Sequence, residues 1–363
     1  MTTLLALVLT CFFIGNSYVF IRSLQAISGT PLYIKILFGI LFWLSAISLF
    51  IVLALRHANL PEFLPKTLFK IGSTWMVIIL YMSLILFALD VIKYFFAPNI
   101  KHMFWYAIAA TSIILLYGYI NYLNPRINRI DIAIEKPFKG DSMTIVALSD
   151  MHLGYGTGKE RLKKFVRMIK HEKPDLILIA GDLIDNSLLP LQNEHMEKEL
   201  KELDAPMGVY MVPGNHEYIS GIEESKQFIS NCGIKMLCDS VVELPNGIQL
   251  ILRDDFFNRE RMPLEDLISG TDGSKPMIMV DHQPHGITRK NELGIDLQIS
   301  GHTHNGQIWP GNIVTNMIYE QSNGYRKWSH SHVYVSSGIS LWGPPFRIGT
   351  NGDMAVFKIH SKK

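Results

Sequence analysis

The chain has 363 residues, of which 48% are hydrophobic, and its formal net charge is +2 at pH 7. This charge balance gives no reason to expect a nucleic-acid partner, because proteins that bind nucleic acids usually carry a strong excess of Lys and Arg. The length exceeds that of one typical domain, so we expect two units. The apolar residues are spread unevenly, which indicates that the two units differ in kind.

Four long runs without Asp, Glu, Lys or Arg precede Arg126, and they cover residues 2–21, 36–55, 71–89 and 103–125. A helix needs about 20 apolar residues to cross the hydrocarbon core of a membrane, and all four runs are long enough. Aromatic residues lie near several of their ends, as they do at membrane interfaces. We therefore predict a region of four transmembrane helices over residues 1–127, in a multi-pass protein of the inner or cell membrane.

The first run could instead be a signal peptide. It lacks a basic amino-terminal region and a clear cleavage site of small residues, so an uncleaved helix is the better interpretation. Orientation follows from Lys and Arg, of which seven lie in the second loop and after the fourth run, against four in the other two loops. Because cytoplasmic loops carry the excess of Lys and Arg, we expect the rest of the chain to be cytoplasmic.

From about residue 128 the pattern changes to short apolar strands. "MTIVALSD" (143–150) and "DLILIAGD" (175–182) read as buried strands, and "GKERLKKFVRMIKHEK" (158–173) between them has its apolar residues at helical spacing. Further apolar stretches of strand length follow toward the carboxyl terminus. Alternation of strands and helices, followed mostly by strands, predicts an α/β domain over residues 128–363 in which helices cover β-sheets.

Five of these strands run directly into polar clusters, which read "SDMH", "GD", "GNHE", "DHQPH" and "SGHTH". Open α/β sheets place their sites at the carboxyl ends of strands. The side chains there that can bind metal are Asp150, His152, Asp182, Asn215, His216, His282, His302 and His304. Carboxylate, imidazole and amide ligands suit a divalent transition metal, and the lack of cysteine argues against a structural zinc site. Eight groups are enough for a pair of ions, with Asp182 as the candidate bridge.

The motifs "SDMHLG", "AGDLIDN", "VPGNHEY", "DHQP" and "SGHTHNGQ" resemble those of the calcineurin-like metallophosphoesterases in order and relative spacing. The resemblance covers residues 143–310 and implies an αββα sandwich of two sheets. It implies one metal ion on Asp150, His152, Asp182 and His304, and a second on Asp182, Asn215, His282 and His302. His216 would face the phosphate and stabilise or protonate the leaving oxygen. Manganese, iron and zinc all fit such a ligand set.

Several residues close to these motifs have more than one interpretation. His282 fits the pattern of the family, so His285 is expected beside the metal site rather than in it. Glu217 and Asp185 are interpreted as structural. Arg347, in "GPPFRIG", either meets a substrate phosphate or forms a structural ion pair. Asp281 is expected either to be solvated at the end of its strand or to contact a metal-binding residue from outside the site.

Together these features predict a membrane-anchored binuclear-metal phosphohydrolase, in which a metal-bound hydroxide attacks a phosphodiester, phosphomonoester or pyrophosphate. Four spans exceed what tethering needs, so a lipid-linked substrate is the leading expectation, with membrane lipids as further partners. A nucleotide-activated diacylglucosamine is the substrate of some relatives, whereas a cell-wall or nucleotide phosphodiester stays open. The alternative is a non-catalytic membrane sensor that binds metal or nucleotide, and the complete ligand set argues against it.

Overall fold

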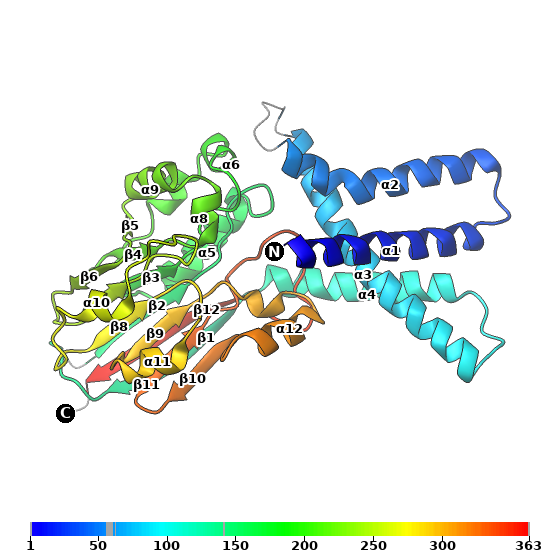
Figure 1. Cartoon of the computed structure of the whole chain (residues 1–363). Helices are drawn as coiled ribbons and strands as arrows, with labels where there is room; N and C mark the ends of the chain where they lie inside the picture. Colours follow the sequence, from blue (N-terminus) through cyan, green and yellow to red (C-terminus); the bar gives the residue numbers. More distant parts are fainter. Residues whose placement is uncertain (1, 56–60, 62, 141, 362–363) are drawn as a thin grey trace. The chain divides into compact units, whose positions relative to one another are not determined.

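The computed structural model describes residues 2–55, 61, 63–140 and 142–361. The chain divides into two compact units, each drawn in Figure 1. The helical unit comprises Met1–Ile120 with Gly343–Phe346, and the catalytic unit comprises Asn121–Trp342 with Arg347–Lys363.

Four long helices make up most of the helical unit: α1 (Thr2–Ala26), α2 (Leu32–Ala54), α3 (Phe63–Phe95) and α4 (Met103–Leu123). Three of them, α2, α3 and α4, are long and apolar enough to cross a membrane. They correspond to the runs predicted at 36–55, 71–89 and 103–125. The run at 2–21 lies in α1, some of whose side chains are outside the described residues, so its crossing stays a prediction.

These helices are held together by close packing and by one group of polar and charged side chains. A Cβ on Gly72 of α3 would lie 2.3 Å from the backbone nitrogen of Leu49 in α2, so only glycine permits this approach. The carboxylate of Asp90 in α3 accepts a hydrogen bond of 2.5 Å from the Tyr18 hydroxyl and forms an ion pair of 3.1 Å with Arg22, both in α1. The one acidic residue at the end of the 71–89 run is therefore paired within the helical unit.

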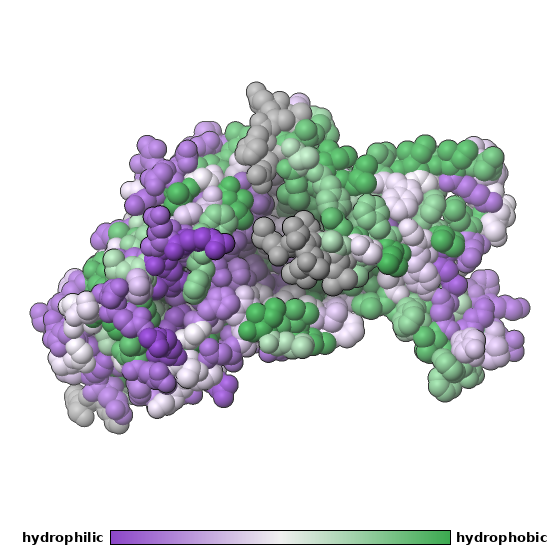
Figure 2. Space-filling view, in the orientation of Figure 1, coloured by the Kyte–Doolittle hydropathy of each residue, from purple (hydrophilic) through white to green (hydrophobic). Residues whose placement is uncertain are grey.

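Outward-facing side chains of the helical unit are mostly apolar. On α2 the exposed set is Leu32, Tyr33, Ile34, Ile36, Leu37, Ile40, Leu41, Leu44, Ile47 and Phe50. Figure 2 shows a largely hydrophobic surface over these helices, whereas much of the catalytic unit is hydrophilic. Apolar surface of this extent is stable in contact with lipid but not with water.

Two six-stranded mixed sheets form the catalytic unit. The first has the order β1 (Arg126–Ile134), β12 (Asp353–Ser361), β2 (Ser142–Leu148), β3 (Leu176–Ala180), β4 (Val209–Val212) and β5 (Lys235–Met236). The second has the order β10 (Gly324–Trp328), β11 (Ser331–Val335), β9 (Leu297–Ser300), β8 (Met277–Val280), β7 (Gln249–Leu252) and β6 (Ser240–Glu243). Strands β2 to β5 are parallel, as are β7, β8, β9 and β11, so their carboxyl ends lie along one edge of each sheet.

Strand periodicity explains the layers. Ile145 of the first sheet and Leu250 of the second belong to one buried cluster between the sheets. Val146, the next residue after Ile145, packs on the opposite face with Phe165 of α5 (Lys159–His171). Leu264 of α10 (Leu264–Ile268) packs on the outer face of the second sheet. The predicted αββα sandwich is therefore confirmed. The remaining helices are α5 (Lys159–His171), α6 (Leu189–Asn193), α7 (Glu197–Leu200), α8 (Asn215–Ile219), α9 (Ile222–Asn231), α10 (Leu264–Ile268), α11 (Ile287–Glu292), α12 (Gly311–Ile318) and the 3₁₀ helix η1 (His304–Gly306).

Candidate metal centre

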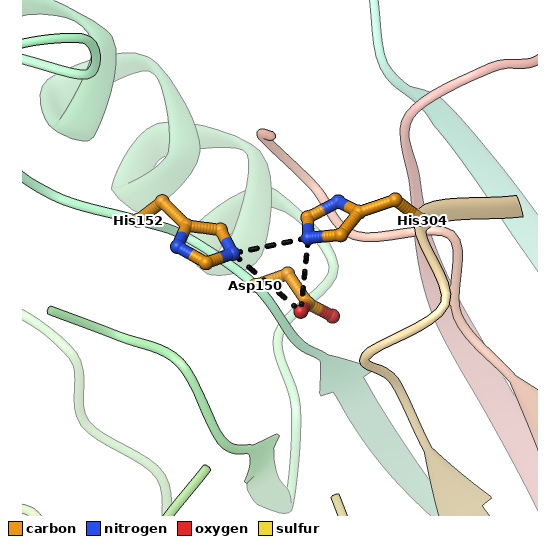
Figure 3. A group of neighbouring side chains, drawn as sticks. All are labelled: Asp150, His152 and His304. Carbon is orange, nitrogen blue, oxygen red and sulfur yellow. Dashed lines mark hydrogen bonds and ion pairs between the residues drawn. The ribbon is translucent and has the colours of Figure 1, made fainter. Parts of the chain in front are cut away.

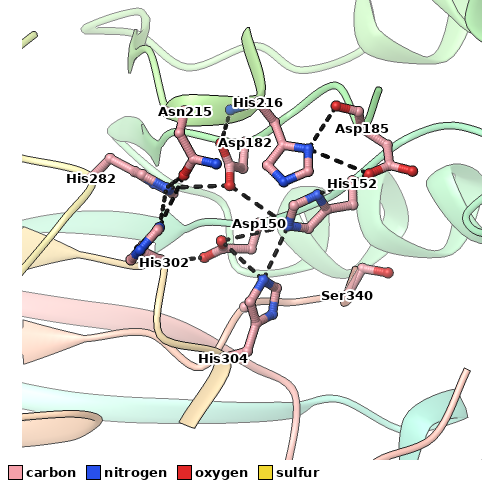
Figure 4. Close-up of polar contacts among 12 residues, drawn as sticks. Asp150, His152, Asp182, Asp185, Asn215, His216, His282, His302, His304 and Ser340 are labelled. Atoms are coloured by element: carbon pink, nitrogen blue, oxygen red, sulfur yellow. Dashed lines mark hydrogen bonds and ion pairs between the residues drawn. The ribbon is translucent and has the colours of Figure 1, made fainter. Parts of the chain in front are cut away.

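All eight side chains selected from the sequence meet at one place. They follow the carboxyl ends of β2, β3 and β4 in the first sheet and of β8 and β9 in the second. Figure 4 draws them as one connected set: Asp150, His152, Asp182, Asn215, His216, His282, His302 and His304. The ends of these five strands, which are far apart in the sequence, thus converge in the structure as expected.

The first cluster consists of Asp150, His152 and His304 (Figure 3). Nε2 of His304 lies 3.4 Å from Oδ1 of Asp150 and 3.1 Å from Nε2 of His152. Nε2 of His152 lies 3.7 Å from Oδ1 of Asp150. Donor atoms that bind one transition metal, each at about 2.0–2.2 Å from it, have separations of this order.

The second cluster contains Asp182, Asn215, His282 and His302 (Figure 4). Nδ1 of His302 is 3.0 Å from Oδ1 of Asn215 and 3.2 Å from Nε2 of His282. Oδ2 of Asp182 is 3.2 Å from Nε2 of His282 and 3.7 Å from Nε2 of His152, which belongs to the first cluster. A single carboxylate oxygen therefore lies between the two clusters.

Backbone carbonyls fix the tautomers of two of the imidazoles. Nδ1 of His282 lies 2.7 Å from the carbonyl oxygen of Ala180, and Nδ1 of His216 lies 2.7 Å from that of Asp185. Because a carbonyl only accepts, each Nδ1 carries the proton and donates it, which leaves the Nε2 lone pair free. In His282 this lone pair faces Asp182, and in His216 the second ring nitrogen points toward the cluster (Figure 4).

Charge and unsatisfied polar atoms at the site fit bound cations. Oδ1 of Asp150 is buried and accepts no hydrogen bond from the described residues. Burial lowers the pKa of His152, yet the neighbouring carboxylates of Asp150 and Asp185 outweigh burial and raise that pKa to about 10. Buried carboxylates thus attract positive charge, as a proton or as a metal ion. Burial lowers the pKa of His302 to about 4, so its imidazole is neutral, the form that binds metal.

Five of the predicted ligands have left-handed backbone conformations, which non-glycine residues rarely adopt. Their φ angles are 54° for Asp150, 43° for His152, 53° for Asp182, 69° for His302 and 48° for His304. Each such conformation costs about 1–3 kcal/mol and persists where the surroundings enforce it, commonly at functional sites. The surrounding structure therefore holds these five residues in strained backbone conformations that place their side chains at the site.

Two glycines make room for the carboxylates. A Cβ on Gly214 would lie 2.1 Å from Oδ1 of Asp182, and a Cβ on Gly301 would lie 2.4 Å from Oδ2 of Asp150. Both distances are shorter than any non-bonded contact, so neither position accepts a side chain unless the site moves. These glycines belong to the "PGNHE" and "SGHTH" motifs, which explains why glycine precedes ligands in both.

Glu217 has a structural part in the site, in agreement with its interpretation from the sequence. Its buried carboxylate accepts hydrogen bonds from the backbone N–H groups of Asp182 (2.9 Å), Ile184 (3.0 Å) and Gly214 (2.8 Å). One side chain on α8 therefore ties the loop after β3 to the loop after β4. Those loops carry the bridging carboxylate and the asparagine of the second cluster.

Arg347 follows neither of its two predicted roles. The side chain is 1% exposed, and its guanidinium donates to the carbonyl oxygens of His304 at 2.7 Å and of Gly338 at 3.2 Å, and to those of Ser337 and Ser340. It therefore fixes the backbone of a metal-site histidine against the loop after β11. Carbonyl partners have no sequence signature, so this role could not be read from the motif.

Asp281, directly after the carboxyl end of β8, has cationic partners that were not identified from the sequence. Asp281 is fully buried and forms ion pairs with Arg261 at 2.6 Å and Lys290 at 2.8 Å, so it is not solvated at the end of β8. His285 lies outside both clusters, with its ring 5.0 Å from that of Tyr319. This position agrees with its interpretation as a neighbour of the site.

Comparison with known proteins identifies the family. The sequence profile described as calcineurin-like phosphoesterase matches residues 143–306. An uncharacterised metallophosphoesterase of Aquifex aeolicus (strain VF5) is 30% identical over 253 residues, which cover 68% of this chain and 96% of that protein. This chain belongs to the calcineurin-like metallophosphoesterase family. It is a metal-dependent phosphoesterase, and enzymes of this family use two divalent metal ions, for which the two clusters provide suitable groups.

Other metallophosphoesterases extend the comparison. An uncharacterised metallophosphoesterase of Helicobacter pylori (strain J99) is 33% identical over 257 residues, or 67% of this chain and 66% of that protein. A zebrafish (Danio rerio) protein named transmembrane protein with metallophosphoesterase domain is 29% identical over 266 residues, or 68% of this chain and 60% of that protein. The chain thus spans less than two thirds of the length of these two relatives. With its three long apolar helices, this metallophosphoesterase is a membrane protein.

Proposed function

We propose that this metallophosphoesterase is a multi-pass, membrane-anchored phosphohydrolase with a binuclear metal centre. Residues 1–127 act as the anchor and residues 128–363 as the catalytic domain. The position of Asp182 carries the proposal, because its Oδ2 is 3.7 Å from His152 in one cluster and 3.2 Å from His282 in the other. A shared carboxylate is what a pair of neighbouring ions requires.

The ligands divide between the ions as follows: Asp150, His152, Asp182 and His304 for the first, and Asp182, Asn215, His282 and His302 for the second. When bound, two divalent cations polarise a phosphoryl oxygen and lower the pKa of an attacking water. The protein orients the donors before the ions arrive. In His282 the Nδ1–H group donates to the Ala180 carbonyl, which keeps Nε2 free for the metal.

His216 faces the substrate phosphate and assists departure of the leaving oxygen. Its backbone N–H donates to Oδ1 of Asp182 at 2.9 Å, and its Nδ1–H donates to the Asp185 carbonyl, so the ring cannot turn away from the clusters. When the ring is an imidazolium, its Nε2 carries a second proton, which it can donate to the leaving oxygen as a general acid. Asp185, whose Oδ1 is also 3.5 Å from Nδ1 of His152, positions both rings.

A lipid-linked phosphodiester, phosphomonoester or pyrophosphate is the substrate class that we favour. The support is the membrane anchor, since a soluble nucleotide would not require an enzyme held at the bilayer. The Lys and Arg distribution around the helices favours a cytoplasmic catalytic domain. Manganese, iron and zinc are all compatible with the mixed nitrogen and oxygen donors.

Hydrolysis of bis-p-nitrophenyl phosphate by the purified full-length protein with Mn²⁺ tests the activity. We expect turnover that falls by more than about 10²-fold in Asp182→Asn, because this change weakens both metal sites together. Asp204→Asn, at an exposed carboxylate, is the matched control and should retain full activity. An absence of turnover with every divalent metal tried would favour the non-catalytic membrane sensor.

A further inference from the structure

Helix α12 is amphipathic in the opposite sense to that expected on a water-soluble domain. Surface helices normally bury their apolar face and expose their polar one. None of the residues of α12 is buried, and its exposed apolar side chains are Ile313 (49%), Val314 (55%), Met317 (81%) and Ile318 (61%). Figure 2 shows the resulting hydrophobic patch among more polar surface of the catalytic unit.

Two asparagines of α12 place a side-chain oxygen against the protein, although Asn316 as a whole is exposed. Asn316 accepts a hydrogen bond from the Ser322 hydroxyl, and Oδ1 of Asn312 is buried. The segment from 309 to 319, "WPGNIVTNMIY", contains no Asp, Glu, Lys or Arg, and it has an aromatic residue at each end. Charges make entry into a membrane costly, and aromatic residues favour the interface between lipid and water. This composition suits a lipid surface rather than water.

Hydrogen bonds within the catalytic unit join the start of α12 to the last turn of α4. The Asn121 side chain donates to the Thr350 carbonyl at 2.6 Å, and the Thr350 hydroxyl donates to the Gln307 carbonyl at 2.6 Å. The backbone N–H of Trp309 donates to the Ile348 carbonyl at 2.8 Å. Since α4 is long and apolar enough to cross a membrane, the point where it ends is close to the lipid surface.

From these observations we propose that α12 is an interfacial helix, whose face of Ile313, Val314, Met317 and Ile318 inserts into the lipid surface next to the end of α4. Such helices lie in the plane of the interface with the apolar side in the acyl boundary. The bilayer is the occupant that fits an uncharged face placed beside the end of a membrane helix.

The far end of α12 lies beside the metal centre. The ring of Tyr319, which follows the helix, is 6.4 Å from that of His302 and 5.0 Å from that of His285. An inserted α12 therefore brings the metal centre to the level of lipid headgroups and presents a membrane-embedded phosphate ester to it. This second step rests on the proposed phosphohydrolase activity, whereas the insertion does not.

Fluorescence of a label on α12 tests the insertion in the full-length protein in phosphatidylcholine nanodiscs. Cys11 and Cys238 are replaced by serine, and an NBD group is attached at Met317→Cys or, in a second variant, at Val314→Cys. We expect blue-shifted emission and strong quenching by phosphatidylcholine with a doxyl group near the headgroup. A label at Val241→Cys, an apolar position on β6 that is 38% exposed, should remain unquenched.

Equal quenching at both α12 positions and at Val241 would overturn the proposal. Energy transfer between labelled copies without lipid quenching would also overturn it, because the face would then meet a second copy of the chain. Turnover of bis-p-nitrophenyl phosphate is measured in the same samples. Quenching without turnover would contradict the hydrolase alone, and turnover without quenching would contradict the interfacial helix alone.

Discussion

The helical and catalytic units place their polar groups in opposite ways. In α2 the exposed side chains are apolar, and the acidic Asp90 of α3 is paired inside the helical unit. In the catalytic unit, Asp150, Asp182 and Glu217 are buried while most of the surface is polar. The surrounding lipid explains the first arrangement, because polar groups that are exposed to lipid cost free energy, whereas apolar side chains do not. Chemistry explains the second, because buried carboxylates cost free energy unless they are paired or bind metal.

Removal of metal is the strongest test of that second explanation. Prolonged treatment with a chelator should abolish hydrolysis of bis-p-nitrophenyl phosphate, and added Mn²⁺ should restore it, because the buried donors then regain their cations. Circular dichroism of the same samples should show that the helices persist. Activity that survives complete removal of metal would show that the buried carboxylates serve some other purpose.

Replacement of His216 by glutamine should lower kcat by roughly 10²- to 10⁴-fold, the usual contribution of a general acid. The metal content of the variant should equal that of the wild type, since His216 is not among the proposed ligands. A substrate with a p-nitrophenolate leaving group needs less protonation than an alkyl ester, so the loss should be larger for the alkyl ester. An equal loss on both substrates would argue against proton donation.

Loss of the Glu217 carboxylate should destabilise the catalytic unit by roughly 3–9 kcal/mol, since Glu217→Ala leaves three buried N–H groups without their acceptor, at about 1–3 kcal/mol each. The Tm of the full-length protein, followed by tryptophan fluorescence, measures this change. Glu223→Ala, at an exposed carboxylate on α9, is the control and should leave Tm nearly unchanged. Similar Tm values for the two variants would contradict the structural role of Glu217.

One substitution made in both units compares their surroundings directly. Replacement of Leu44, which is 51% exposed near the middle of α2, by Asp should make membrane insertion less favourable by about 2.5–3.5 kcal/mol. Val241→Asp, at a 38% exposed position on β6, should change stability by less than about 0.5 kcal/mol. The fraction of each variant that resists carbonate extraction measures the difference. Equal extraction of the two would show that Leu44 does not face lipid.

Much of this organisation could be predicted from the sequence, because both units use local signals. Uncharged runs predicted four transmembrane helices, of which α2, α3 and α4 are long and apolar enough to cross a membrane. Strands that end in polar clusters predicted which side chains would meet. Those signals are short and periodic, so they can be recognised without knowledge of the tertiary structure.

Features that depend on contacts between distant backbone atoms could not be predicted in this way. Arg347 acts through carbonyl oxygens, and any sequence has a carbonyl at every residue. Asp281 is paired with Arg261 and Lys290, whose proximity depends on how the loops around β8 fold. The inverted face of α12 was also missed, because its apolar spacing is that of an ordinary core helix and only its exposure distinguishes it.

Electron paramagnetic resonance of the Mn²⁺-loaded full-length protein, combined with elemental analysis, tests most directly whether two ions share Asp182. We predict two manganese ions per chain and the spectrum of an exchange-coupled pair, replaced in Asp182→Asn by the spectrum of isolated Mn²⁺ or by loss of the metal. A single ion per chain, or two ions without magnetic coupling in the wild type, would contradict the account.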